Sequence, residues 1–410
     1  MNVRKLMSVV VMFLAVTLVT PLGMAAEYTM TASRDYTRLY AMVMPFSDNV
    51  TEALIAWWNE NKAKKLGVSL KVKKYDMRYD ASVVASTWPS ILTVDKPICH
   101  FGLGGCDAAA LMKRLPKDKV PLFNSTGTYG FIWKPNQWIF HPRPTYPHEI
   151  AGFLNWARMN KIKDRPIRVG ILNSKAVAAF VDMVAGFKAF AKVTPWVEVV
   201  GTEWAEAKPV TLLSEVRRLS RQKPDYIWIA TTADQVIGTI KAQKELGVQI
   251  PVVASSHNSL SLANWAIKDI NFFEGHYDVY AGDPGLDLNV PGAKLVTDYW
   301  KKNNIDTKWN LICVQVFLPQ MLTFMAVERA VAMVGKDNIT GEAIYNAMFG
   351  TTFTEEGFMG LASSMTFTKD CPFSTKDLKV KATTVRNGKH ISVTGKEWIP
   401  VPEVPKWVTE

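Results

Sequence analysis

The sequence predicts an α/β protein with two doubly wound lobes, each built on a mainly parallel sheet with helices on both faces. Short β-branched or aromatic runs alternate with longer segments whose apolar residues recur three and four positions apart. The strand-like runs before residue 281 outnumber the roughly six strands of one such domain. A chain of 410 residues is also long enough for two domains of ordinary size.

The predicted strands are short and apolar, which is typical of parallel sheets covered on both faces. In chain order they are Leu39–Pro45, Val68–Tyr75, Ile98–Leu103, Pro121–Ser125, Ile167–Leu172, Val197–Thr202, Asp225–Thr231, Pro251–Ser255 and Gly275–Tyr280. The segments between them have helical periodicity. Farther along we expect long helices near Pro291–Lys302 and Leu311–Val334, then strand-like pieces at Ser364–Phe367 and Lys379–Val385.

Two loop-rich passages, Phe140–Pro147 and Ala281–Gly285, interrupt this alternation. The first is a good position for the chain to cross from one lobe to the other. Ligands of open α/β sheets bind beyond the carboxyl ends of the strands, so the site is expected in the cleft between the lobes. The expected division is residues 27–143 plus 283–357 for lobe 1, and 144–282 plus 358–410 for lobe 2.

The first 26 residues have the order of a secretory signal peptide. A basic start at Arg4 and Lys5 precedes the apolar run Leu6–Val19, and small residues follow up to an expected cleavage near Ala25 or Ala26. The alternative is a retained anchor, but the run is about 14 residues and a bilayer needs ~20. No later segment is expected to span a membrane. The mature chain is therefore predicted to be a soluble periplasmic protein.

The formal net charge of +11 falls to +9 once Arg4 and Lys5 leave with the signal peptide. A basic protein can bind nucleic acid. Here the lysines are scattered among apolar positions, and export also argues against such a partner. We expect no nucleic-acid binding.

The sequence carries no motif that predicts catalysis or a cofactor. It lacks a G-x-S-x-G elbow, a P-loop and an H-E-x-x-H pair. The turn Gly102–Gly105 is not a dinucleotide loop, because Asp107 stands where the third glycine would fall. The histidines and the cysteines have no metal-ligand spacing. Cys99 and Cys106 form either a bridge or two thiols, and the sequence leaves this open. The prediction is a binding protein, not an enzyme.

Several segments follow one another in an order that is typical of one family. They are Tyr75–Asp80, Phe101–Ala109, Val120–Thr128, Trp138–Arg143, Lys223–Trp228, Ala242–Gly247, Glu274–Tyr277 and Ala326–Ala330. Through them the mature chain resembles the type I periplasmic solute-binding proteins of the leucine/isoleucine/valine group, which serve ABC importers. The resemblance implies two lobes joined by a three-strand hinge, closure on a small ligand, a monomeric chain and a permease as partner.

The resemblance also implies where the ligand binds. In this family helix N-termini and hydroxyls hold the ligand carboxylate, which suits the unpaired N–H groups of a first helical turn. The positions implied in lobe 1 and on the late helix are Gly104, Gly105, Cys106, Asp107, Ser125, Thr126, Thr128 and Phe317. Those implied in lobe 2 are Ser174, Lys175, Thr231, Thr232, Asp234, Ser256 and His257. The alternative is plain turn and cap chemistry, with Asp107 as a cap. Trp133 and Trp138 either stack on an aromatic ligand or belong to the core.

One departure from the family bears on the ligand. Ser256 stands where the family has the acid that receives an α-ammonium group. An unpaired buried ammonium costs several kcal/mol, whereas a micromolar complex has only about 8 kcal/mol in all. Either Asp76, Asp107 or Asp234 supplies the charge, or the ligand is not an amino acid, which we favour. We expect the solute receptor of an importer. A ligand-sensing protein on the same fold is the alternative, and an exported enzyme is a third reading.

Overall fold

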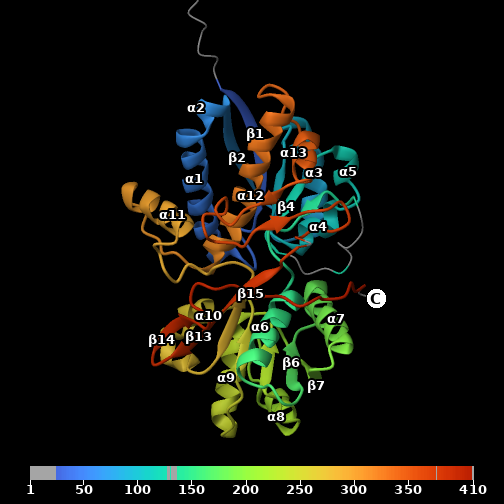
Figure 1. Ribbon diagram of the computed structural model, residues 1–410, viewed down its shortest axis with the longest axis vertical. Helices are drawn as coiled ribbons and strands as arrows, with labels where there is room; N and C mark the ends of the chain where they lie inside the picture. The colour runs from blue at the N-terminus through green and yellow to red at the C-terminus, as the bar shows by residue number, and fades with distance from the viewer. Residues whose placement is uncertain (1–24, 127–129, 131–135, 375, 409–410) are drawn as a thin grey trace, which may run out of the picture.

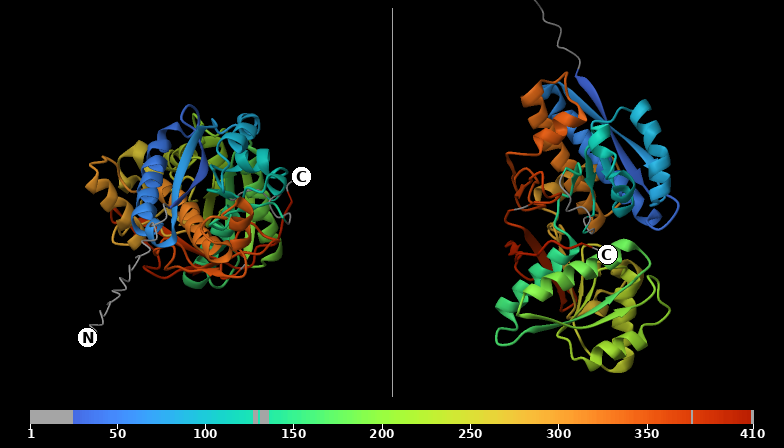
Figure 2. Two further views of the ribbon diagram at one scale, coloured as in Figure 1. Left: turned by 90° about the horizontal axis from the view of Figure 1, so that it is seen from above. Right: turned by 90° about the vertical axis from the view of Figure 1, so that its right-hand side faces the viewer.

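The computed structural model describes residues 25–126, 130, 136–374 and 376–408. Two α/β lobes lie one above the other (Figure 1). The chain crosses between them after the strand Ile139–Phe140, after Tyr277–Tyr280 and before Lys379–Arg386. The predicted two-lobed fold with a three-strand hinge is therefore confirmed. Figure 2 shows the same two lobes from the side, with the C-terminal residues at the level of the boundary.

Lobe 1 is built on a five-stranded parallel sheet in the order β2-β1-β3-β4-β5. Its strands are β1 (Ala26–Arg34), β2 (Val68–Asp76), β3 (His100–Gly102), β4 (Leu122–Asn124) and β5 (Ile139–Phe140). Its helices are α1 (Met44–Asn61), α2 (Ala63–Leu66), α3 (Ala81–Val94), α4 (Gly105–Leu111), α5 (Leu115–Asp118), α11 (Pro291–Lys302), α12 (Leu311–Val334) and α13 (Gly341–Ala347). A small antiparallel pair, β11 (Thr352–Phe353) and β12 (Met365–Thr366), follows.

Lobe 2 is built on a sheet in the order β14-β13-β10-β9-β8-β6-β7, with β15 beside β13. Its strands are β6 (Ile167–Asn173), β7 (Val197–Trp204), β8 (Tyr226–Ile229), β9 (Val252–Ala254), β10 (Tyr277–Tyr280), β13 (Lys379–Arg386), β14 (Lys389–Ser392) and β15 (Ile399–Pro400). Its helices are α6 (Tyr146–Asn160), α7 (Ala178–Val193), α8 (Leu213–Arg221), α9 (Ala233–Leu246) and α10 (Leu260–Ile267). Strands β6 to β10 pair in parallel, and β13 closes the sheet antiparallel to β10.

The predicted first strand, Leu39–Pro45, is wrong. A 3₁₀ turn occupies Ala41–Val43 and α1 begins at Met44, with Pro45 in its first turn, where a missing N–H costs nothing. The real first strand is β1, which pairs with β2 along its whole length. Polar residues inside β1 interrupt the apolar run by which the other strands were predicted. Thr31 and Ser33 are buried, and their hydroxyls lie 2.8 and 3.0 Å from the ring nitrogens of His100.

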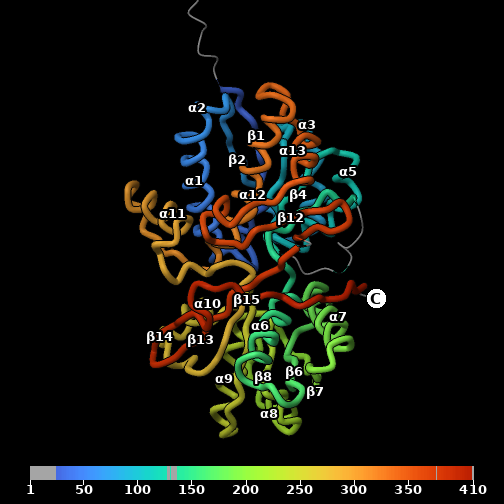
Figure 3. The backbone as a smooth tube through the Cα atoms, viewed as in Figure 1, coloured from blue at the N-terminus to red at the C-terminus, as the bar shows by residue number. Residues whose placement is uncertain are grey.

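Helix α12 corrects a second expectation. Among the described residues it alone is long and apolar enough to cross a membrane, although we expected no such segment after the expected signal peptide. Yet 72% of its apolar window is buried in the protein. Phe317, Leu322 and Phe324 lie in the core of lobe 1. The helix is therefore a central core element, and Figure 3 shows its segment running through the upper lobe.

The packing bears on where the last crossing lies. Phe358, Leu361, Phe367 and Phe373 all belong to the core of lobe 1, although the expected division gave residues 358–410 to lobe 2. The chain joins the second sheet only at β13. We therefore propose that lobe 1 extends to about residue 373, with the remaining boundaries as expected.

Candidate ligand-binding cleft

A cavity lies between the two lobes. It holds about 600 Å3 of empty space, including the part that is open to solvent. Lobe 1 contributes the loop after β1, α1, the end of β4 and α12, and lobe 2 contributes the loop after β9 and α10. The aromatic lining is Tyr40, Tyr79 and His257. The aliphatic lining is Val43, Met44, Leu103, Leu262, Ile312 and Val316, and the polar lining is Ser47, Ser125, Thr126 and Gln315.

The lining of this cavity contains no Asp, Glu, Lys or Arg among the described residues. Burial, together with the charge of Arg143, lowers the pKa of His257 to about 4. The imidazole is therefore neutral at pH 7. The cavity thus offers rings, aliphatic groups, hydroxyls and an amide, but no formal charge.

Tyr40 reaches the cavity because the buried Asp35 and the half-buried Asp76 hold the loop that carries it. Asp35 accepts hydrogen bonds from the backbone N–H groups of Arg38 and Tyr40, each 2.8 Å long. Asp76 accepts from the N–H of Tyr36 and from the hydroxyl of Thr37, both at 3.1 Å. The Tyr40 ring meets Tyr79 edge to face, with 4.8 Å between centroids.

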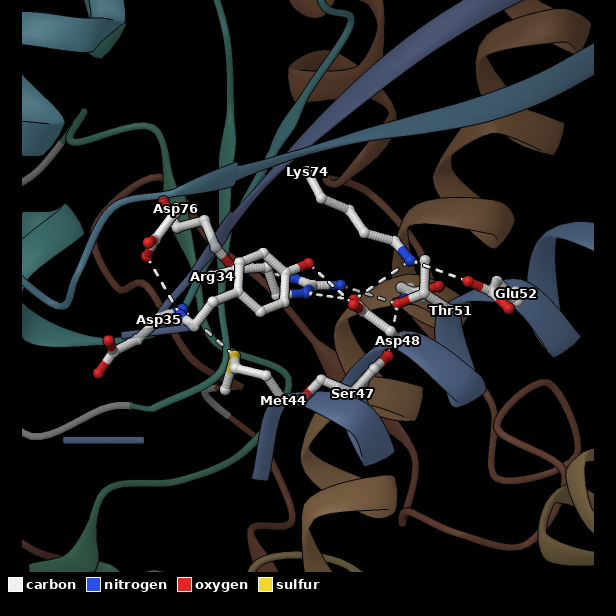
Figure 4. A network of polar contacts seen from close by, with 12 residues as sticks. Arg34, Asp35, Met44, Ser47, Asp48, Thr51, Glu52, Lys74 and Asp76 are labelled. Carbon is white, nitrogen blue, oxygen red and sulfur yellow. Dashed lines mark hydrogen bonds and ion pairs between the residues drawn. The ribbon is translucent and has the colours of Figure 1, made fainter. Parts of the chain in front are cut away.

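A charged network anchors the start of α1, which presents Met44 and Ser47 to the cavity (Figure 4). Arg34 donates to Asp48 through Nε at 2.8 Å and to the Thr51 hydroxyl through Nη2 at 3.0 Å. Lys74 lies 3.2 Å from the same Asp48 carboxylate. Burial alone would raise the pKa of Asp48, but Arg34, together with Tyr36 and Lys74, keeps that pKa below its ordinary value. The network therefore fixes α1 against β1.

A polar cluster around Ser256 positions His257. Glu149 accepts from the Ser256 hydroxyl at 2.5 Å and from its N–H at 3.0 Å. Arg143 donates to the Ser256 hydroxyl and to the Tyr146 hydroxyl, both at 2.8 Å. Tyr146 in turn lies 3.2 Å from Nδ1 of His257. Arg143 and Glu149 are both buried, so any charge on them lies behind the lining rather than within it.

Sequence reasoning missed both Arg143 and Glu149. Arg143 stands in the Pro-rich crossing passage, and Glu149 is the acid in the first turn of α6. A charged residue in a passage expected to join the lobes, Arg143, was the available signal. What they contact depends on how α6 meets the loop after β9, which no local pattern gives.

The implied lobe 1 residues occupy several different environments. Ser125 and Thr126 line the cavity. Gly105 and Cys106 line a wider chamber beside it, which Tyr79 also lines. Thr128 and Trp133 fall outside the described residues. Trp138 belongs to the core of lobe 1, where its ring stacks on Tyr345 with 4.0 Å between centroids.

Asp107 acts as a cap and does not face the cavity. Its carboxylate is fully buried and accepts from the N–H groups of Leu103 and Gly104 at 2.9 and 3.3 Å, and from the Ser33 hydroxyl. Its acceptor sites are therefore already used. Asp76 is likewise occupied by the loop after β1, so neither acid is placed to receive a ligand ammonium.

Most implied lobe 2 residues lie away from the cavity. Thr231 and Thr232 bond the Gln235 side chain and the Ala207 carbonyl, and Asp234 is exposed in the first turn of α9. Ser174 accepts from the N–H of Ala176, and Lys175 lies 5.3 Å from the Trp204 ring centroid. Phe317 on α12 does not line the cavity. Its ring is buried in lobe 1, and Gln315 and Val316 face the cavity instead.

The cysteine bridge that the sequence left open does not form. Cys99 and Cys106 are free, as are Cys313 and Cys371. Cys99 is fully buried in the core of lobe 1, whereas Cys106 lies at the start of α4.

Two α/β lobes with three crossings and a cavity between them define a type I periplasmic binding protein. The chain matches the family described as periplasmic binding protein over residues 34–371, and it belongs to that family. The family consists of solute-binding proteins of ABC transporter type, which are not enzymes, and it implies an extracytoplasmic location. A comparison by sequence with curated proteins gives no match.

Solved structures share the fold at low sequence identity. A branched-chain amino acid ABC transporter protein from Thermus thermophilus with bound valine aligns with a TM-score of 0.75 and 16% identity over 92% of this chain and 97% of that one. A fatty acid ABC transporter substrate-binding protein from Thermomonospora curvata gives 0.72 and 19% over 92% and 95%. A solute-binding protein from R. palustris in complex with benzoate gives 0.70 and 14% over 93% and 99%.

Proposed function

We propose that the protein is the extracytoplasmic receptor of an ABC importer, and that it captures a small ligand without an α-ammonium group. The observation that carries this proposal is the uncharged lining of the cavity between the lobes. The ligand would have an aromatic or branched apolar body, which matches the rings and aliphatic side chains. Hydroxyls of Ser125 and Thr126 would bond its polar atoms.

The lack of a free carboxylate beside the cavity, among the described residues, disfavours an amino acid as the ligand. A buried ammonium needs a carboxylate partner, since leaving a buried charge unpaired costs several kcal/mol. The cavity lining has none, Asp107 and Asp76 are occupied, and both oxygens of Glu149 accept from Ser256. Ser256 therefore holds the Glu149 carboxyl group behind the wall of the cavity.

Closure of the lobes would complete the site. Contacts already join the lobes across the cavity. The Gln315 amide donates to the Ser256 carbonyl at 2.6 Å, and the Tyr40 hydroxyl lies 3.4 Å from Nε2 of His257. Phe46 of α1 packs on Trp265 of α10 with 5.1 Å between centroids. These contacts break when the lobes separate, so they favour a hinge motion that shields the ligand from water.

The relatives support a receptor but leave the ligand open, because they bind an amino acid, benzoate or fatty acids according to their names. We further propose that residues 1–26 are a signal peptide, that the mature chain is a periplasmic monomer, and that a permease is its partner. The closed face presented by both lobes would be what the permease recognises.

A thermal-shift screen of the mature protein tests this function. The compounds are amino acids, amides, aromatic acids and short dicarboxylates. Saturation at about 100 times the Kd adds about 2.7 kcal/mol, which raises the Tm of a lobe of this size by about 5–10 °C. We expect aromatic acids or amides to give this shift, and leucine and valine to give none. A larger rise in Tm with leucine or valine than with the aromatic acids and amides would contradict the proposal.

A further inference from the structure

We propose that the cleft has a second chamber that binds the anionic group of the ligand; this inference rests on the proposed function. The chamber holds about 1540 Å3 of empty space, including the part open to solvent. Lobe 1 lines it with Arg38, Arg78, Asp80 and Cys106, and lobe 2 lines it with Val177 and Lys208. We call it the outer chamber, and the cavity described above the inner chamber.

The two chambers adjoin at Tyr79, which lines both. Arg78 and Tyr79 are consecutive and both have positive φ, 54° and 48°. Such backbone angles are uncommon outside glycine and asparagine, and they cluster at functional sites. Asp76 holds the turn by accepting from the N–H of Arg78 at 3.2 Å. One turn therefore supplies both the dividing ring and a cation beyond it.

The outer chamber has positive charge that no residue neutralises. Arg38 is paired with Asp80, at 3.1 Å. Within the described part of the chain, neither Arg78 nor Lys208 has an ion-pair or hydrogen-bond partner for its side-chain nitrogens, and both side chains are exposed. The inner chamber has no charge at all. The cleft thus has a neutral interior and a cationic mouth.

The two cations come from opposite lobes, and this links them to closure. Two positive charges that face each other across a cleft repel each other and oppose its closure. An anion bound between them attracts both and therefore favours closure. Guanidinium and ammonium groups both bind carboxylates well. A carboxylate in the outer chamber would therefore favour the closed form.

These features together point to an amphipathic carboxylate, with an apolar or aromatic body in the inner chamber and its anionic group in the outer one. The ligand would therefore carry its apolar body and its anionic group at opposite ends. The positive charge at the mouth would also attract such an anion as it approaches.

A matched pair of probes tests the inference, 3-phenylpropanoate and its uncharged amide, with titration calorimetry on the mature protein. The variants are Arg78→Gln, Lys208→Gln and the double substitution. The controls are Arg217→Gln on α8 and Lys241→Gln on α9, which are also exposed and lie outside the cleft lining. A thermal melt of each variant checks that it is folded.

We expect each single cleft variant to bind 3-phenylpropanoate about 2- to 5-fold more weakly, and the double variant about 10-fold more weakly. These factors are small because exposed ion pairs contribute little free energy. Binding of the amide should not change, and the effect on the acid should shrink at about 1 M salt. The control variants should leave both probes unaffected. Equal losses for acid and amide, or no loss for either, would overturn the inference while leaving the receptor function intact.

Failure of both phenyl probes to bind the parent protein would also overturn the inferred ligand class. That result would be distinguishable from failure of the proposed function. The wider screen would still show a thermal shift with another compound if the protein is a receptor.

Discussion

The loop that carries Tyr40 gives a prediction whose size follows from the structure. Asp35 is fully buried and accepts two backbone N–H groups, from Arg38 and Tyr40, at 2.8 Å each. A hydrogen bond to a charged group contributes about 1.5–3 kcal/mol, and this loop is partly exposed, so the lower figure applies. Asp35→Ala removes both bonds and should loosen the loop by about 3 kcal/mol. Asp35→Asn keeps one oxygen acceptor and should lose about half of that.

Hydrogen exchange measures this effect without a ligand. The amides of Arg38 and Tyr40 should exchange about 100-fold faster in Asp35→Ala and about 10-fold faster in Asp35→Asn, because 1.4 kcal/mol is a factor of ten. Tyr40→Phe is the control, because it leaves both N–H bonds in place and should leave exchange nearly unchanged. Unchanged exchange in Asp35→Ala would refute the idea that Asp35 positions Tyr40. Ligand affinity should fall in the same order as protection.

Three further predictions follow from buried groups. Burial raises the pKa of Glu149 to about 7 from 4.5, against the opposing charge of Arg143. The protonated carboxyl therefore stabilises the fold below pH 4.5, and this stabilisation, roughly 2–3 kcal/mol, is lost as the pH rises through 7. In thermal melts from pH 5 to 9, Glu149→Gln should show a smaller loss of stability than the parent protein. Asp107→Ala should destabilise the protein by about 2–4 kcal/mol in denaturant unfolding, because it strands buried donors, whereas an unchanged midpoint with lost binding would make Asp107 a ligand contact instead. Alkylation after unfolding without reductant should modify all four cysteines, and a missing pair of adducts would reveal a disulfide.

The helices and the buried strands could be predicted because their signals are local. The bounds of α12 match the expected Leu311–Val334, since a long apolar segment lies between a capping Asn310 and Gly335. Parallel strands such as β8 and β9 have continuous apolar runs. Strand β1 escaped because its buried Thr31 and Ser33 are polar, and their burial depends on His100 of a neighbouring strand.

The site could be predicted only in part, for a related reason. Ser125 and Thr126 directly follow a strand and line the cavity. They could be predicted because ligands of open α/β sheets bind beyond the carboxyl ends of parallel strands. Tyr40, Tyr79 and Gln315 come from two loops and a helix that are far apart in sequence. Long-range hydrogen bonds and packing fix their directions, and periodicity carries no such information.

The pair L-phenylalanine and 3-phenylpropanoate differs only in the α-ammonium group, so a calorimetric comparison of the two tests the central claim most directly. The neutral cavity predicts that 3-phenylpropanoate binds at least about 100-fold more tightly, because the ammonium would lose water without gaining a carboxylate. Tighter binding of L-phenylalanine would contradict the account.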